Sequence, residues 1–89
     1  MLAINTTKKI GEFHDKSLII IDDDNPFRER LSRAMEKKGF VVMQAESVKK
    51  AIKLVRLKKP AFVVVDLRLN DGNGLEVVKE IHNLDIKSR

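Results

Sequence analysis

The sequence predicts an α/β fold in which parallel strands alternate with helices. Two short runs, residues 18–21 and 62–65, are apolar at every position, as expected of strands that are buried on both faces of a parallel sheet. Between and after these runs, apolar residues recur at helical spacing, and Ser, Asn, Gly and Pro stand where helices would begin and end. A chain of 89 residues has room for one small domain of this kind.

The first half of the chain predicts a strand, a helix and a second strand. Residues 17–22 form the first strand. Asn25 is the expected N-cap of the helix, with Pro26 at its first position, and Gly39 ends it. The apolar residues of this helix share one face that should turn toward the core: Phe27, Leu31, Ala34 and Met35. Residues 40–45 follow as the second strand.

The second half predicts a helix, a strand and a third helix. Ser47 should cap the second helix, and Pro60 separates it from the third strand, residues 61–67. The inner face of the second helix should carry Val48, Ala51, Ile52 and Val55. Residues 70–74 are rich in Asn and Gly and predict a turn. The third helix should begin on the inward residues Leu75, Val78 and Ile81. Residues 83–89 are expected to form a loop or a frayed end.

This alternation predicts the order of the strands in the sheet. Short loops between strands and helices imply parallel strands joined by right-handed crossovers. Placing the first and third strands side by side gives the order 2-1-3, the start of a flavodoxin-like three-layer fold with the sequence β-α-β-α-β-α. We expect residues 1–16 to be an N-terminal extension and residues 17–89 to form the domain.

Acidic residues close the first and third strands. Asp22 and Asp23 follow the first strand, and Asp66 follows the third. In an open α/β sheet, ligands bind at this edge, so the three carboxylates should converge there. They would repel one another unless a cation lies among them, and Mg²⁺ prefers such oxygen ligands. The simpler interpretation, capping and solvation of loops, suits Asp24 or Asp71 taken alone.

Composition narrows the functional class. The net charge is +5, but the basic residues fall on polar helix faces or helix ends, where they could steer an acidic or phosphorylated partner: Lys37, Lys38, Lys49, Lys50, Lys53, Arg56, Lys58 and Lys59. All four aromatic residues are Phe and none forms a stacking platform, so we expect no direct nucleic-acid binding. The chain has no Cys, no signal-like segment and no membrane-length apolar run, which predicts a cytoplasmic protein.

The acidic motifs resemble those of a known family, the receiver domain of two-component response regulators. The resemblance is carried by Ile-Asp-Asp-Asp at 21–24, Pro-Phe at 26–27, and Val-Val-Asp-Leu-Arg-Leu at 64–69 followed by Gly-Leu-Glu at 74–76. Further segments at 33–36, 45–47 and 71–75 are most similar to the alphaproteobacterial global regulators of redox response and photosynthesis. The likeness covers residues 17 to about 84.

The resemblance implies a function and roles for particular residues. Asp66 would be the phosphoacceptor, receiving a phosphoryl group from a sensor histidine kinase with the help of Mg²⁺. Asp23 would bind the metal directly, Asp22 would bind it through a water, and the backbone carbonyl of Arg68 would complete the protein ligands. Such a domain acts in phosphorelay signalling and is not itself an enzyme. An Asp-dependent phosphatase or phosphotransferase is a weaker alternative, because it would need an acid where Arg68 stands.

The chain departs from the family pattern in two respects. Asn70 and Asn73 stand where Pro and Asp are usual. Family members also continue into a fourth strand ending in Ser or Thr, a fifth ending in Lys, and an output domain, and the sequence stops where the fourth strand would begin. We therefore expect a partial receiver that does not switch, with an exposed edge on the third strand that makes it a homo-oligomer. The main alternative is a receiver-like interaction module that cannot be phosphorylated.

Overall fold

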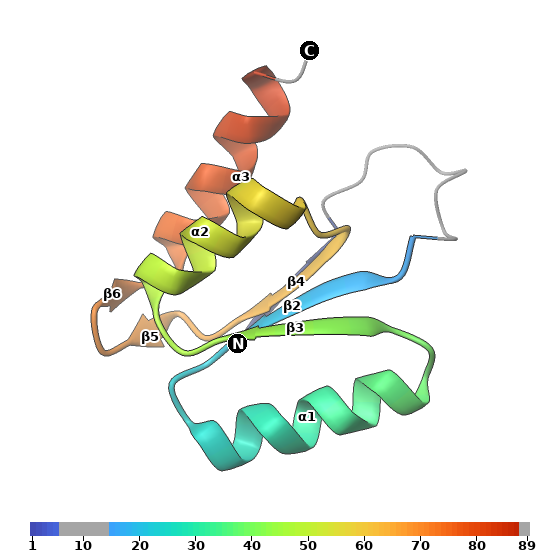
Figure 1. The fold of residues 1–89 in the computed structure, drawn as a ribbon. Helices are drawn as coiled ribbons and strands as arrows, with labels where there is room; N and C mark the ends of the chain where they lie inside the picture. Colours follow the sequence, from blue (N-terminus) through green and yellow to red (C-terminus); the bar gives the residue numbers. More distant parts are fainter. Residues whose placement is uncertain (6–14, 88–89) are drawn as a thin grey trace.

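A four-stranded sheet forms the middle layer of the molecule (Figure 1). The structure is a computed structural model that describes residues 1–5 and 15–87. Strand β2 (Ser17–Ile21) pairs in parallel with β3 (Val41–Ala45) on one side and with β4 (Phe62–Val65) on the other. The predicted order of these three strands, with the first in the centre, is therefore confirmed.

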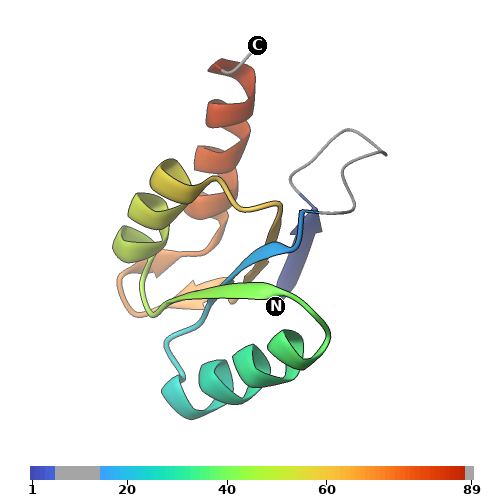
Figure 2. The same ribbon diagram turned by 45° about the vertical axis from the view of Figure 1, so that its right-hand side comes forward.

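Helices cover both faces of the sheet. Helix α1 (Asn25–Lys37) lies on one face, and α2 (Val48–Lys58) and α3 (Leu75–Lys87) lie on the other (Figures 1 and 2). Because side chains alternate along a strand, β2 and β4 each send every second residue toward α2 and α3. The buried core therefore lies between the sheet and these two helices: Ile19, Ile21, Ala45, Val48, Ala51, Val55, Val63, Val65, Leu69 and Val77.

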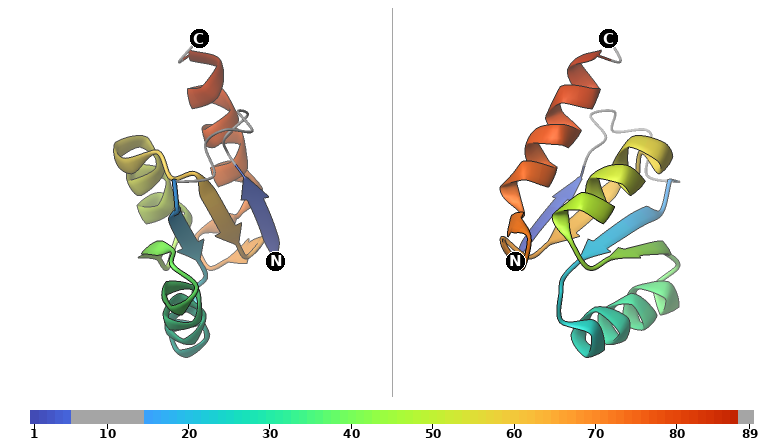
Figure 3. Two further views of the ribbon diagram at one scale, coloured as in Figure 1. Left: turned by 90° about the vertical axis from the view of Figure 1, so that its right-hand side faces the viewer. Right: turned by 60° about the vertical axis from the view of Figure 1, so that its left-hand side comes forward.

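A short N-terminal strand, β1 (Leu2–Asn5), pairs antiparallel with β4 (Figure 3). The register runs from Leu2 opposite Val65 to Asn5 opposite Phe62. Leu2 and Ile4 are half-buried and pack against the core. The prediction that residues 61–67 present an exposed edge is therefore wrong, since β1 satisfies the backbone groups on that side of β4.

The start of α1 differs from the prediction by one residue. Asp24, not Asn25, is the N-cap, and its carboxylate accepts a hydrogen bond from the backbone N–H of Phe27 at 3.1 Å. The side chain of Asn25 has another partner, because its Oδ1 accepts a hydrogen bond from Arg28. Both residue types are good caps, and in the structure Asp24 is the cap while Asn25 bonds within the first turn of the helix.

The other predicted boundaries of α1 and α2 are confirmed. Ser47 caps α2 by accepting a hydrogen bond from the backbone N–H of Lys50 at 3.1 Å. Gly39 follows the end of α1 with a φ of +97°, a left-handed conformation that glycine adopts at low cost. The inner face of α2 is also as predicted, with Val48, Ala51 and Val55 buried.

The inner faces of the other two helices are only partly as predicted. In α1, Arg28 and Ser32 are the buried residues, whereas Ala34 is exposed. In α3, Val77 is fully buried, and Leu75 remains 44% exposed. A helix that packs on only one side of a sheet can turn about its own axis by part of a turn when its polar side chains find partners. The periodicity of the apolar residues therefore did not determine which side of each helix faces the sheet.

Helix α3 is longer than predicted. It continues to Lys87, whereas residues 83–89 were expected to form a loop or frayed end; residues 88–89 of that prediction lie outside the described residues. The segment contains neither Gly nor Pro to stop it, and Leu84 packs against the core. No helix of the part described is both long and apolar enough to serve as a membrane span.

Candidate acidic site at the carboxyl ends of β2 and β4

Three carboxylates meet at one edge of the sheet, as predicted. Asp22, Asp23 and Asp66 each offer a carboxylate oxygen, and these oxygens all lie within 4.8 Å of one another. The sheet carries them there because its pairing continues past the strands. The backbone N–H of Asp66 donates to the carbonyl of Ile21 at 2.9 Å, and that of Asp22 donates to Ala45 at 3.0 Å.

The three acids have different surroundings. Asp22 is buried, and its Oδ1 accepts a hydrogen bond from the backbone N–H of Asp24 at 2.9 Å. Asp23 and Asp66 are half-buried. Oδ1 of Asp66 accepts a hydrogen bond from the backbone N–H of Arg68 at 3.1 Å. The Asp22 side chain is thus buried at the edge of the sheet and fixed by a hydrogen bond, whereas Asp23 and Asp66 are accessible to a ligand from solvent.

The donor set fits a hard divalent cation. Three carboxylates at this separation repel one another, and a cation between them would remove that repulsion. All the side-chain donors are oxygens, which favours Mg²⁺ or Ca²⁺ over metals that prefer sulfur or imidazole. Two accessible carboxylates would leave Mg²⁺ several of its waters.

A small hairpin follows Asp66 where the sequence predicted only a turn. Strands β5 (Arg68–Leu69) and β6 (Gly72–Asn73) pair antiparallel before α3 begins. The backbone of Gly74 lies against the backbone of Asp66. A Cβ at Gly74 would overlap the carbonyl oxygen of Asp66 and approach Cγ2 of Val65 to 2.8 Å. Only glycine allows this close approach of the two backbone segments.

Asp71 ties the hairpin to α2. Its carboxylate accepts hydrogen bonds from the backbone N–H groups of Val48 at 2.8 Å and Lys49 at 3.1 Å. These bonds at a helix N-terminus lower the pKa of Asp71 below its ordinary value of 3.8. Sequence reasoning gave Asp71 only a solvation role. The one available signal was that the first turn of α2 contains no acidic residue, which leaves its N–H groups available to a carboxylate from elsewhere.

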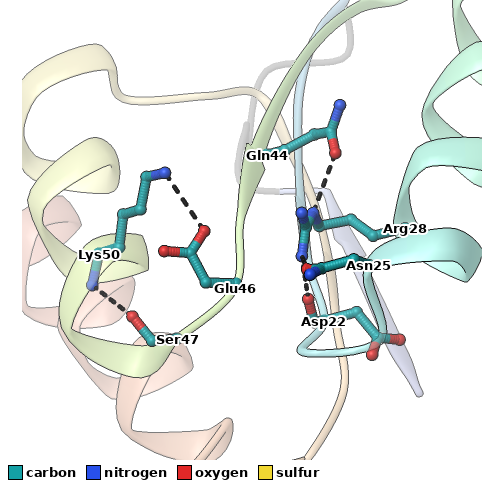
Figure 4. A network of polar contacts seen from close by, with 7 residues as sticks. All are labelled: Asp22, Asn25, Arg28, Gln44, Glu46, Ser47 and Lys50. Atoms are coloured by element: carbon teal, nitrogen blue, oxygen red, sulfur yellow. Dashed lines mark hydrogen bonds and ion pairs between the residues drawn. The ribbon is translucent and has the colours of Figure 1, made fainter.

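Arg28 is a second residue whose role the sequence did not indicate. Its Nη1 donates to the carbonyl of Asp22 at 2.8 Å and to Oδ1 of Asn25 at 2.7 Å (Figure 4). Its Nε donates to Oε1 of Gln44 at 2.9 Å. The guanidinium thus joins α1 to β3 and holds the backbone from which Asp23 projects. Nothing in the helical periodicity distinguishes Arg28 from the exposed arginines of α1.

Comparison with known proteins places this geometry in a family. The family description of the response regulator receiver domain matches residues 18–89, most of the chain. The chain belongs to the response regulator receiver domain family. Receiver domains of this family are the regulatory components of two-component systems, and the resemblance seen in the sequence is confirmed.

Two relatives are regulators from alphaproteobacteria. The photosynthetic apparatus regulatory protein RegA of Cereibacter sphaeroides is 54% identical over 65 residues, covering 73% of this chain and 35% of that protein. The acid tolerance regulatory protein ActR of Rhizobium meliloti is 52% identical over 67 residues, covering 75% of this chain and 34% of that protein. The chain therefore spans about a third of the length of these relatives.

A solved receiver structure shares the fold. A response regulator protein from Burkholderia pseudomallei matches with a TM-score of 0.74 and 36% identity, covering 79% of this chain and 41% of that chain. That structure is described as containing a phosphorylated aspartic acid, a calcium ion and citrate. The flavodoxin-like receiver fold predicted from the sequence is thereby confirmed.

Proposed function

We propose that Asp66 of this receiver domain accepts a phosphoryl group from a sensor histidine kinase. The observation that carries the proposal is the convergence of Asp22, Asp23 and Asp66, with oxygens within 4.8 Å, at the ligand-binding edge of a receiver fold. Residues 17–89 would be the partial receiver domain, to which β1 adds an edge strand.

The chemistry of the transfer assigns the nucleophile to Asp66. A carboxylate oxygen attacks phosphorus in line, a new O–P bond forms, and the P–N bond to the kinase histidine breaks. The imidazole keeps the electron pair and takes a proton from solvent. The backbone N–H of Arg68 holds Oδ1 of Asp66, which orients the carboxylate and leaves its second oxygen available for the attack.

Mg²⁺ would occupy the acidic edge. We assign Asp23, Asp66 and the backbone carbonyl of Arg68 as direct ligands and Asp22 as a ligand through water, which agrees with the burial of Asp22 and its hydrogen bond from Asp24. When bound, the metal neutralises the repulsion between carboxylate and phosphoryl oxygens.

Phosphorylation of this chain should be slow, and activation should not follow. Among residues 1–5 and 15–84, neither a lysine nor an arginine forms an ion pair with Asp66, so within these ranges no cation is already paired with this carboxylate that could stabilise the outer phosphoryl oxygens. We therefore propose that the chain carries the metal side of the pocket and depends on other groups for switching.

Intact mass spectrometry after incubation with acetyl phosphate and Mg²⁺ tests the proposal. The chain should gain one phosphoryl group, and Asp66→Asn should gain none. Asp23→Ala should lose Mg²⁺ binding in calorimetry, whereas Asp24→Asn, which alters an exposed helix cap, should retain it. A chain that binds Mg²⁺ but never gains mass would instead be the receiver-like interaction module.

A further inference from the structure

The outer face of α2 carries a groove that the acidic site does not use. Its volume is about 470 Å³, and all its lining residues belong to one segment: Ser47, Lys49, Lys50, Lys53, Leu54 and Leu57. The opposite face of α2 packs on the core through Ala51 and Val55. The groove therefore opens away from the sheet and stands apart from Asp66.

The groove runs along about two helical turns, and the apolar part of its floor is formed by Leu54 and Leu57. Leu57 is 75% exposed, and Leu54, three residues earlier, is half-buried. Together with Lys50 they form a stripe at positions i, i+4 and i+7, which extends for about 10 Å along the helix. Anchors at this spacing suit the apolar face of a second helix laid along the groove.

The rim of the groove is positively charged. Lys50 pairs with Glu46 at 3.2 Å, which offsets one of the three charges (Figure 4). Lys49 and Lys53 form no ion pair with any residue of the described ranges. Their ammonium groups thus remain available to carboxylates of a partner, over an apolar floor that would be shielded from water.

We propose that this groove docks an acidic amphipathic helix of a partner protein. Leucine-like residues of that helix would cover Leu54 and Leu57, and its acidic residues would face Lys49 and Lys53. The proposal goes beyond phosphoacceptance, because no residue of the acidic site takes part.

The same features argue against other occupants. In a symmetric contact between two copies of the chain, each groove would face its twin, and the lysines would oppose one another. Nucleic acid would meet a leucine floor with no aromatic side chain on which a base could stack. An acidic helix satisfies both the charge and the apolar surface.

The test uses a fluorescein-labelled peptide of about 15 residues, long enough to form a helix, with Leu on one face and Glu on its flanks. Anisotropy titration of the whole 89-residue chain at about 0.15 M salt should show saturable binding. Lys53→Glu and Leu57→Asn should each weaken that binding about tenfold. Both residues are exposed, so the variants should fold.

Matched controls distinguish binding in the groove from non-specific electrostatic or hydrophobic binding elsewhere on the surface. Lys58→Glu, at an exposed lysine of the same helix outside the groove, and Leu75→Asn, at an exposed leucine of α3, should each change affinity less than about twofold. A peptide of the same composition with its leucines scattered should bind more weakly. Equal binding of the scattered peptide, or equal loss in the controls, would overturn the proposal.

Two further outcomes would also reject an acidic helix as the occupant. The first is tighter binding of a DNA duplex than of the peptide, with affinity unaffected by Leu57→Asn and falling steeply with salt. The second is a dimer in light scattering that Lys53→Glu abolishes. NMR shifts on peptide addition that are confined to residues 47–57 would support the proposed groove.

Discussion

At the scale of single residues, Gly74 is the position where the backbone leaves least room. Gly74→Ala would force the chain after Asp66 to move, because the new Cβ would overlap the Asp66 carbonyl and crowd Val65. We expect a loss of roughly 1–3 kcal/mol in the free energy of unfolding, together with weaker Mg²⁺ binding. Chemical denaturation and calorimetric titration measure the two effects.

Gly39→Ala is the matched control for Gly74→Ala. No atom lies within 4 Å of a Cβ at Gly39, but its φ of +97° makes alanine strained by about 1–2 kcal/mol. This variant should lose stability and keep its Mg²⁺ affinity. If both variants lost metal affinity alike, the effect would reflect global stability, and the contact beneath Asp66 would have no special role.

Arg28 is a buried cation that stabilises the backbone of the acidic site through its hydrogen bond to the carbonyl of Asp22. Arg28→Met keeps most of the side-chain volume but leaves the carbonyl of Asp22 without its donor. Because Arg28 is only 8% exposed, we expect a loss of about 1–3 kcal/mol in unfolding free energy. Urea denaturation should show this loss for Arg28→Met and almost none for Arg33→Met, at an exposed position on the same helix. Equal midpoints for the two variants would contradict the assigned role.

At the scale of elements, the Asp71 carboxylate joins the β5–β6 hairpin to the N-terminus of α2. Its lowered pKa means that the ionised form is favoured in the folded chain. The resulting stability is present above the ordinary value of 3.8 and is lost as the pH falls through the lower folded value. The hairpin should therefore loosen in acid.

Asp71→Asn tests this pH dependence. The variant should melt at a lower temperature than the parent at neutral pH, since the amide lacks the charge that favours both N–H bonds. The difference should shrink as the pH falls through the lowered pKa of Asp71 in the folded parent, because the parent carboxylate then becomes protonated. Glu29→Gln, at an exposed acid on α1 with no hydrogen bond to its carboxylate among the described residues, is the matched control and should melt at the same temperature as the parent at neutral pH. A difference independent of pH would reject the charged clamp.

At the scale of the whole molecule, β1 determines which sheet edges remain open. It occupies the outer side of β4, so the unpaired edges of the described sheet belong to β1 and β3. Self-association through β4, as predicted from the sequence, would require β1 to be displaced. We therefore expect the intact chain to be monomeric at concentrations where a chain without β1 is not.

Deleting residues 1–5 tests this competition. Loss of the half-buried Leu2 and Ile4 should cost roughly 2 kcal/mol, and the exposed backbone of β4 should pair with a second copy. Light scattering coupled to size exclusion at high micromolar concentration should show a dimer. Ala3→Ser, which changes an exposed side chain and keeps the strand pairing, should remain monomeric. A monomeric deletion variant would show that edge pairing does not drive association.

Much of the site could be predicted from the sequence because each strand and each helix cap is specified by residues that lie close together in the chain. The apolar runs at 18–21 and 62–65 specify strands buried on both faces, and parallel pairing then brings Asp22, Asp23 and Asp66 to one edge. The Ser47 cap and the Gly39 stop were likewise visible, since capping depends on residues a few positions apart.

Only the tertiary structure decided the contacts between groups that are distant in the chain. Strand β1 has only four residues, too few to predict a strand from the sequence. It forms because β4 offers it an unpaired edge. Asp71 reaches the N–H of Val48, 23 residues away, and Arg28 reaches Gln44, 16 residues away. Periodicity and caps encode local conformation, whereas the choice of a hydrogen-bond partner depends on which groups the assembled layers bring within reach.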